Sequence, residues 1–213
     1  MATRFLLSIT IFLASLSLSA STVCACIWDS DTLSMERNRF PSTLELITGK
    51  FLRHSPDFYR WRVKDRKERL ATDPNNLALI DDLAVAYDKL GQQGDAIKLM
   101  QKALVLSPDR YEGLANLGTF YIHHGELEKG LEYIKRAIVI NPDAHFGREV
   151  YQQLLVEYLL EGPIKVDKYG PRNSQERVRN SLSFVFYIRS KGYDDTAKAV
   201  KGVLGMLRFG HYD

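Results

Sequence analysis

Proline recurs at a fixed interval in the middle of the chain, and this period constrains the fold more than any other feature. Pro74, Pro108 and Pro142 follow one another at 34-residue steps, each beside an aspartate or directly after a polar residue. A period of this length is typical of repeat architectures, in which each unit buries its apolar face by stacking on its neighbours. We therefore expect a stack of equivalent units rather than one closed core.

Two complete repeats align in phase when residues 77–110 are placed over residues 111–144. The alignment pairs Leu83 with Leu117, Tyr87 with Tyr121, Gly91 with Gly125, Ala103 with Ala137 and Val105 with Val139. The pattern resembles the tetratricopeptide repeat (TPR), a helical hairpin, although the signature tryptophan is replaced by other apolar residues in both repeats. The resemblance implies an all-α fold: a TPR helical-hairpin array forming a right-handed α-solenoid, with two clear repeats and degenerate flanking helices.

Small residues mark the places where the two helices of each repeat cross. Only Ala or Gly there lets the backbones approach without a side chain between them. These positions are Ala84, Ala96 and Ala103 in the first repeat and Gly118, Gly130 and Ala137 in the second. Gly91 and Gly125 stand where the first helix must end, and the proline that follows each repeat cannot continue the second helix.

A degenerate helical pair is expected before the repeats, in residues 42–76. Ser42 can cap a helix over residues 42–54, because Glu45 three residues later completes a capping box. A second helix over residues 57–71 ends in register with the repeats. Its basic residues are interleaved with acidic ones, as on a solvated helix face, and a surface for lipid or an acidic partner is the alternative. The basic residues are Arg60, Arg62, Lys64, Arg66, Lys67 and Arg69.

Helices of less regular pattern follow the repeats. A capping helix in residues 145–161 would cover the open end of the second repeat, and residues 162–173, bracketed by Gly-Pro pairs, are expected to form a loop. Asn173 or Ser174, and then Asp194, can cap the two helices of a C-terminal hairpin in residues 174–213. The sequence stops at Asp213 straight after this hairpin, so it is a candidate for truncation there.

The first residues carry the pattern of an export signal. Arg4 is followed by an uncharged, largely apolar stretch over residues 5–23, so we expect residues 1–25 to be a signal peptide and residues 26–41 a tether. A membrane anchor is the alternative. Cleavage near Ser21 would give a soluble product, whereas cleavage after Ala25 resembles a bacterial lipobox, from which Cys24 departs, and makes Cys26 the lipidation candidate. The predicted location is the periplasm or cell envelope.

Charge and cysteine content exclude two classes of protein. The chain has 29 Lys and Arg against 26 Asp and Glu, a net charge of +3, which is far from the strong positive charge of proteins held on nucleic acid by many phosphate contacts. Nucleic acid is therefore not an expected partner. The only cysteines, Cys24 and Cys26, precede the repeats, so no disulfide framework can stabilise the fold.

The resemblance also implies a binding site, because stacked TPR hairpins leave a concave groove that takes a peptide or a partner helix. The groove-facing positions fall on the first helix of each repeat, with Ile122 as the expected apolar anchor. They are Asp81, Val85, Asp88 and Lys89, and then Glu112, Ala115, Thr119, Ile122 and His123. The clamp of lysines and asparagines by which some TPR domains hold a C-terminal carboxylate is absent from them. We therefore expect an exported scaffold that binds a protein or peptide partner.

Two short motifs are candidates for metal binding or catalysis, and both fit a scaffold better. His123 and His124 point about 100° apart on a helix, so they cannot easily share one metal ion. Asp29-Ser30-Asp31-Thr32 resembles an aspartyl-phosphate motif, but Leu33 departs from it, and a polar tether carrying a docked Trp28 is the favoured interpretation. No phosphate loop, nucleophile elbow or zinc-protease motif appears. We therefore expect no catalytic activity, no metal site and no cofactor.

An accessory or enzymatic module of an envelope assembly is the alternative function. Such a module would use the unusual C-terminal region, where Tyr169, Arg172 and His211 offer polar side chains. Sequence beyond Asp213 would support it.

Overall fold

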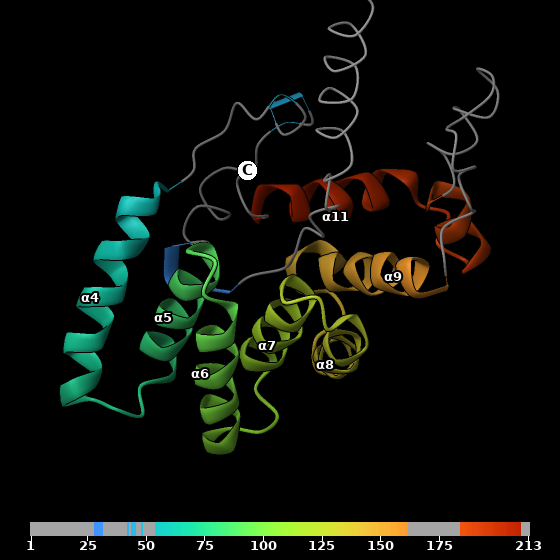
Figure 1. Ribbon diagram of the computed structural model, residues 1–213. Coiled ribbons are helices and arrows are strands. Elements are labelled where there is room, and N and C mark those ends of the chain that lie inside the picture. The colour runs from blue at the N-terminus through green and yellow to red at the C-terminus, as the bar shows by residue number, and fades with distance from the viewer. Residues whose placement is uncertain are drawn as a thin grey trace, which may run out of the picture.

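The computed structural model describes residues 28–31, 42, 44–45, 48, 54–161 and 184–209, and within them all regular structure is helical. The named elements are α4 (Pro56–Thr72), α5 (Leu77–Lys89), α6 (Gln93–Leu106), α7 (Tyr111–His123), α8 (Leu127–Ile140), the 3₁₀ turn η1 (Ala144–Gly147), α9 (Arg148–Glu161) and α11 (Thr196–Phe209). A further helical segment covers residues 184–190. From α4 to α9 the helices follow one another across the molecule in chain order (Figure 1).

Consecutive helices pack on each other and form the expected array. α5 with α6 and α7 with α8 are the two predicted hairpins, α4 packs against α5, and α9 packs against α8. α5 also contacts α7, so the first helices of the two repeats are neighbours. The prediction of an all-helical repeat solenoid is confirmed. We call the side of the array lined by α5 and α7 the inner face, which is the concave side in a stacked solenoid.

The helices begin and end where backbone chemistry requires. Gly91 and Gly125 lie just after the first helix of each repeat and adopt φ values of 75° and 87°, a left-handed conformation that other side chains disfavour. At the start of α4, the Ser55 hydroxyl accepts a hydrogen bond from the Phe58 N–H at 3.3 Å. The predicted bounds of this helix, 57–71, therefore differ from the observed ones by one residue at each end.

The capping box predicted before the repeats is present. The Ser42 N–H donates to Glu45 Oε2 at 2.8 Å, and the Glu45 N–H donates to Ser42 Oγ at 3.3 Å. These reciprocal bonds satisfy two backbone donors at a helix start. Most of the predicted helix over residues 42–54 lies outside the described residues, so its length stays a prediction.

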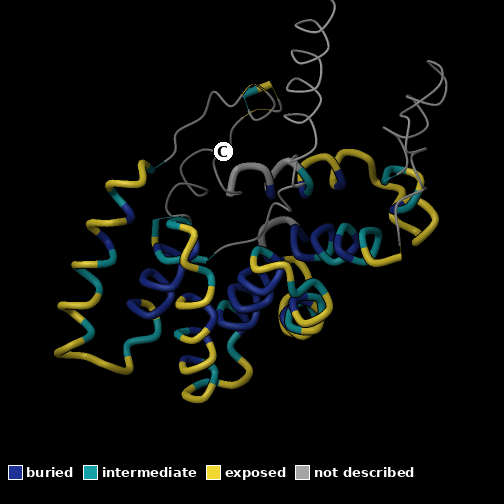
Figure 2. The backbone as a smooth tube through the Cα atoms, viewed as in Figure 1, coloured by how far each residue is buried: buried dark blue, intermediate teal, exposed yellow. Residues whose placement is uncertain are grey.

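Burial differs between the first and second helices of the repeats. α5 and α7 are buried on most sides, whereas α4, α6 and α8 each keep an exposed side (Figure 2). The two repeats share a core in which Val85 and Met100 of the first meet Leu117 and Phe120 of the second. The first helices are thus the interior of the array, and the second helices form much of its surface.

The helices of the second repeat cross at two glycines. A Cβ atom on Gly118 would lie 2.9 Å from the carbonyl oxygen of Gly130, and a Cβ on Gly130 would lie 2.7 Å from that of Gly118 and 2.5 Å from Cγ1 of Ile122. Neither position has room for a side chain, as predicted for small residues at the crossing. The equivalent residues of the first repeat are Ala84 and Ala96, both fully buried.

The predicted capping helix, α9, covers the open end of the second repeat. Its Val156 joins Ile122 and Ile134 in one apolar cluster. α11 packs on α9 in turn, with Tyr151 and Met206 in a second cluster. The prediction that Asp194 caps this last helix is wrong. α11 begins one residue later than that cap requires, and Asp195 Oδ1 accepts from the Lys198 N–H at 2.9 Å.

Several predictions fall on residues outside the described ranges. These are the signal peptide in residues 1–25, the lipidation candidate Cys26, the loop in residues 162–173, and Tyr169, Arg172 and His211. Of the tether in residues 26–41, only residues 28–31 are described. Among the described helices, none combines the length and the apolar character that crossing a bilayer requires.

Candidate functional site

The residues predicted to line an open groove lie mostly in the interior. Val85, Ala115 and Thr119 are fully buried, and Ile122 packs against Ile134 of α8 and Val156 of α9. Lys89, Glu112 and His123 are partly exposed on their helices, although the His123 side chain itself is only 3% exposed. The prediction of an exposed surface at these positions is wrong because α5 packs against α4, α6 and α7, and α7 packs against α5, α6 and α8.

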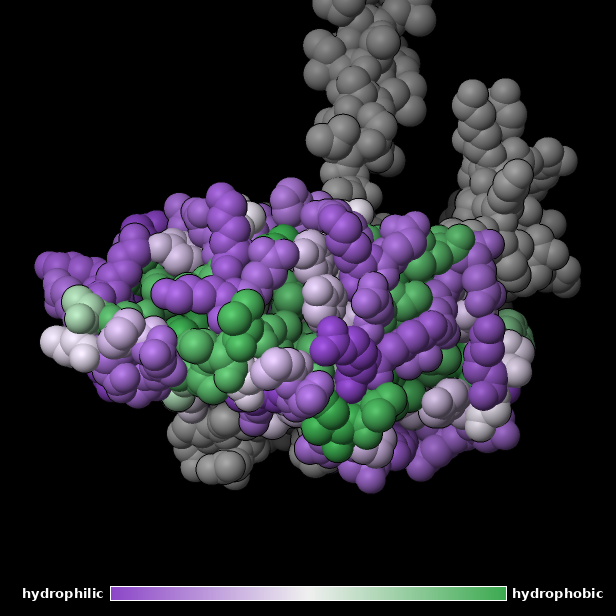
Figure 3. Space-filling model, turned by 90° about the horizontal axis from the view of Figure 1, so that it is seen from below, coloured by the Kyte–Doolittle hydropathy of each residue, from purple (hydrophilic) through white to green (hydrophobic). Residues whose placement is uncertain are grey.

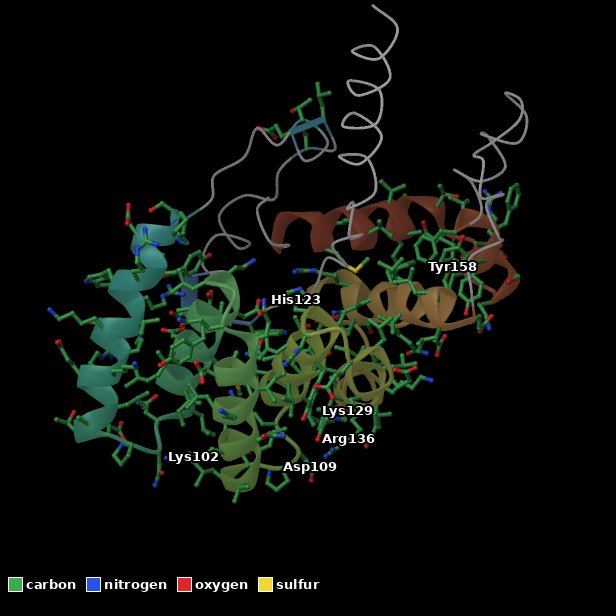
Figure 4. All side chains as sticks on the ribbon, viewed as in Figure 1. Lys102, Asp109, His123, Lys129, Arg136 and Tyr158 are labelled. Atoms are coloured by element: carbon green, nitrogen blue, oxygen red, sulfur yellow. The ribbon has the colours of Figure 1, made fainter. Side chains whose placement is uncertain are left out.

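Polar side chains link these successive first helices. His123 Nδ1 lies 2.8 Å from Asp88 Oδ1, which joins the ends of α7 and α5. The Gln152 amide of α9 donates to Thr119 Oγ1 of α7 at 3.2 Å. In Figure 4 His123 lies toward the upper end of the array, whereas Lys102 and Asp109 lie at its lower end. Asp88, Thr119 and His123 therefore hold the repeats together, which their sequence positions did not reveal.

Asp81 has a further link of this kind. Arg110, directly before α7, forms a two-pronged ion pair with it, in which Nη1 donates to Asp81 Oδ2 at 2.7 Å. Burial raises the pKa of the Asp81 carboxyl to about 6, although the hydrogen bonds from Arg110 act in the opposite direction. The carboxyl thus carries a desolvation cost at neutral pH that the arginine offsets only in part.

A short piece of the chain far from the repeats in sequence lies on the inner face. We call it the N-terminal segment (residues 28–31); it is drawn in blue beside α5 in Figure 1. The Trp28 N–H donates to Asn116 Oδ1 at 2.8 Å, and Asn116 Nδ2 donates to the Trp28 carbonyl at 3.0 Å. The Trp28 ring meets Tyr111 edge to face, with centroids 5.1 Å apart, and packs on the cluster that contains Ala115. The docked Trp28 expected from the sequence is present.

Ser30 is held in the same way by the first helix of the preceding repeat. Its N–H and its hydroxyl each donate to Asp82 Oδ1 of α5 at 2.9 Å. Asp82 is fixed from the other side by Arg66 of α4, whose Nε donates to Oδ2 at 2.9 Å. Burial lowers the pKa of Arg66, but its hydrogen bonds to Asp82 and to Asp65 outweigh that effect and raise it overall.

Arg62 holds the two acidic side chains of the segment. Its Nη1 donates to Asp29 Oδ2 at 2.8 Å, and Nη2 pairs with Asp31. The Arg62 side chain is completely buried and Asp29 is nearly so, while Asp31 stays 38% exposed. The prediction that Arg62 belongs to a solvated basic face is therefore wrong. Arg62 stands 34 residues before the small residue Ala96, so its register in the repeat turns it inward.

The residues that hold the N-terminal segment were not among the predicted groove residues. The 34-residue period of the sequence nevertheless indicates two of them. Asp82 and Asn116 are 34 residues apart, and so occupy one position of successive repeats. Both are almost completely buried, although apolar residues dominate such positions. A polar residue that recurs at a buried position of the repeat indicates a binding site, because every buried polar side chain needs a hydrogen-bond partner. Here the partner is the backbone of the N-terminal segment.

The outer surface has a different character. Val105 and Val139, at equivalent positions near the ends of α6 and α8, are 82% and 85% exposed. Seen from below, apolar patches lie among charged side chains (Figure 3). Among the described residues no group of three or more His, Cys, Asp or Glu side chains is placed to hold a metal ion.

Comparison with known proteins identifies one unit of the array. The tetratricopeptide-repeat family matches residues 80–110, which span most of the first predicted repeat. Among solved structures, the crystal structure of MamA aligns with 75% of this chain and 96% of that chain, at 22% sequence identity and a TM-score of 0.45. No curated protein gives a significant match.

Proposed function

Because the chain is a tetratricopeptide-repeat protein, we propose that it is an exported scaffold that binds a polypeptide partner along its inner face and carries out no catalysis. TPR hairpins commonly serve protein–protein interaction, and the coarser role of a binding scaffold follows from the repeat itself. The nature of the partner, the export of the chain and the lack of catalysis are proposed here beyond that coarser role.

One observation carries this proposal: the inner face holds a stretch of polypeptide by its backbone. Asn116 bonds both the N–H and the carbonyl of one residue, and Asp82 at the equivalent position bonds the N–H two residues further on. Backbone groups occur in every polypeptide, so side chains that satisfy them suit the recognition of a peptide segment. The repeat places such a side chain on the first helix of both repeats, α5 and α7.

Export is proposed from the first residues. Arg4 followed by the uncharged stretch over residues 5–23 has the order of a secretory signal, and Cys26 is the candidate for a lipid anchor. A mature chain starting between Ser21 and Cys26 would begin only a few residues before the docked segment. The scaffold would then work in the periplasm or cell envelope.

Site-specific photo-crosslinking in cells tests the binding role. A crosslinking residue replaces Lys89 or Glu112, which are partly exposed on the first helices, or Lys102, which is exposed on α6 and serves as the control. We expect a covalent adduct of defined mass from the inner-face positions and none from Lys102. An adduct from Lys102 alone would place the partner on the outer surface and contradict the proposal.

A further inference from the structure

The N-terminal segment is bound as a peptide ligand is bound. Asn116 satisfies both backbone groups of Trp28, at 2.8 and 3.0 Å, and Asp82 satisfies the backbone N–H of Ser30 at 2.9 Å. These contacts bind the backbone of the segment, which enters a helical turn at Ser30, and they do not depend on its side chains. They come from two different helices, so they fix both the position and the direction of the segment on the inner face.

Other contacts are specific for the side chains of the segment. Tyr111 takes the Trp28 ring edge to face, and Asp82 accepts from the Ser30 hydroxyl at 2.9 Å. Arg62 pairs with the carboxylates of Asp29 and Asp31. The site therefore distinguishes an aromatic residue, a small hydroxyl residue and two acidic residues in one fixed order.

The burial of Arg62 limits what else could occupy this site. Its side chain has no exposed surface, and a buried guanidinium left without a counter-charge is strongly unfavourable. A ligand that displaces the segment must therefore bring carboxylates to the same place. An apolar or basic peptide would leave the Arg62 charge uncompensated.

We propose that the N-terminal segment is an intramolecular ligand, and that the partner of this site is a peptide of the same chemistry: an aromatic residue followed by acidic residues one and three positions later. This inference rests on the proposed function and specifies its ligand. The tethered segment has an effective concentration on the order of millimolar. A free peptide with the same contacts therefore binds weakly until the segment is released, so the segment keeps the site closed to weaker ligands.

Fluorescence anisotropy tests this directly with the full chain. The probe is a labelled synthetic peptide of residues 27–33, and the released variant carries Trp28→Ala, Asp29→Asn and Asp31→Asn, which removes the side-chain contacts of the segment. We expect the peptide to bind the released variant at least tenfold more tightly than the wild type. Adding Asn116→Ala to the released variant should abolish binding, and a peptide with asparagine for both aspartates should not bind.

A second measurement covers the case in which the released variant does not fold. Trp28 and Trp61 are the only tryptophans, so Trp61→Phe leaves Trp28 as the sole reporter. Excess peptide of residues 27–33 with phenylalanine in place of tryptophan should displace the segment and shift the Trp28 emission to longer wavelength. No shift at saturating peptide would overturn the proposal.

Two other outcomes also decide the matter. A released variant with wild-type helicity that binds no peptide would mean that the segment is only a structural element. A wild-type dimer that Asn116→Ala converts to monomer would mean that a second copy supplies the segment, and would overturn intramolecular binding. If either result came with inner-face crosslinks from Lys89 or Glu112 still present, the scaffold function would stand and only the ligand assignment would fail.

Discussion

Buried polar residues connect the successive first helices of the array through individual hydrogen bonds and ion pairs. Asp81, Asp88 and Thr119 sit at positions that a repeat pattern assigns to an open groove, yet each bonds a residue of the next first helix or its cap. Asp82 and Asn116 instead bond the N-terminal segment. A buried polar group that loses its partner is costly, so these residues should respond strongly to substitution.

The Asp81 carboxyl should make stability depend on pH. Its pKa is about 6 in the folded chain against an ordinary value of 3.8, so the folded state binds the proton more tightly than the unfolded state does. The contribution of Asp81 to stability therefore falls as pH rises from about 4 to about 6, by roughly 2–3 kcal/mol. The free energy of unfolding of wild type minus that of Asp81→Asn should decrease over this range and level off above pH 7. A difference that increases with pH would mean that Arg110 dominates over burial.

Asn116→Ala should destabilise the fold, because it leaves the N–H and the carbonyl of Trp28 without these bonds. We expect a loss of about 1–3 kcal/mol in the free energy of unfolding, measured by urea denaturation. Asn75→Ala is the matched control, since Asn75 is exposed in the turn before α5 and should change stability by less than about 0.5 kcal/mol. Equal effects from the two substitutions would contradict the role given to Asn116.

At the scale of the helices, the spacing of small residues sets how closely each pair packs. Gly118 and Gly130 face each other across α7 and α8, where the first repeat has two alanines. The two hairpins therefore share one pattern but differ in how tightly their helices can cross.

Gly130→Ala should destabilise the second hairpin. The new methyl group would sit 2.5 Å from Ile122 Cγ1 and 2.7 Å from the Gly118 carbonyl, so we expect a loss on the order of 1–3 kcal/mol in the free energy of unfolding. Gly94→Ala is the control, because no atom lies within 4 Å of a Cβ at Gly94 in α6. There the free energy of unfolding should stay level or rise by about 0.4–1 kcal/mol. Similar melting midpoints for both variants would argue against the close crossing.

The helices were predictable from the sequence because local chemistry sets them. The glycines after α5 and α7, the prolines after α6 and α8, and the Ser42–Glu45 capping box each act within a few residues. The site was not predictable in the same way. It joins residues 28–31 to a helix that lies more than eighty residues further along the chain, a pairing that periodicity cannot report. Arg62 was also mispredicted from the sequence. The alternating charges around it predicted a solvent-exposed helix face, whereas its position in the repeat register turns its side chain into the interior.

At the scale of the whole molecule, the fold is an open array with one face partly filled by its own N-terminal segment. Each hairpin contacts mainly its neighbours, so α9 and α11 are needed to cover the apolar end that the second repeat leaves. The N-terminal segment occupies part of the inner face formed by α5 and α7.

If the chain is exported, its signal peptide should be removed from the mature protein. Intact-mass spectrometry of the protein from its native host should find a first residue between Ser21 and Cys26. If Cys26 carries lipid, the mass should include the acyl groups and the protein should partition into detergent. A chain in the envelope fraction that retains Met1 would contradict cleavage, and an unmodified, soluble Cys26 would contradict the lipid anchor.

The inner face binds polypeptide through Asp82 and Asn116, and it already holds residues 28–31. Acrylamide quenching of Trp28 in the Trp61→Phe background measures this most directly. We expect acrylamide to quench Trp28 several-fold less than it quenches a free peptide of residues 27–33. When Asn116→Ala is added and helicity is retained, the quenching should rise toward the free-peptide value. If Trp28 is quenched as strongly as the free peptide while Asn116 is still present, the segment is not bound and the inner face does not hold residues 28–31.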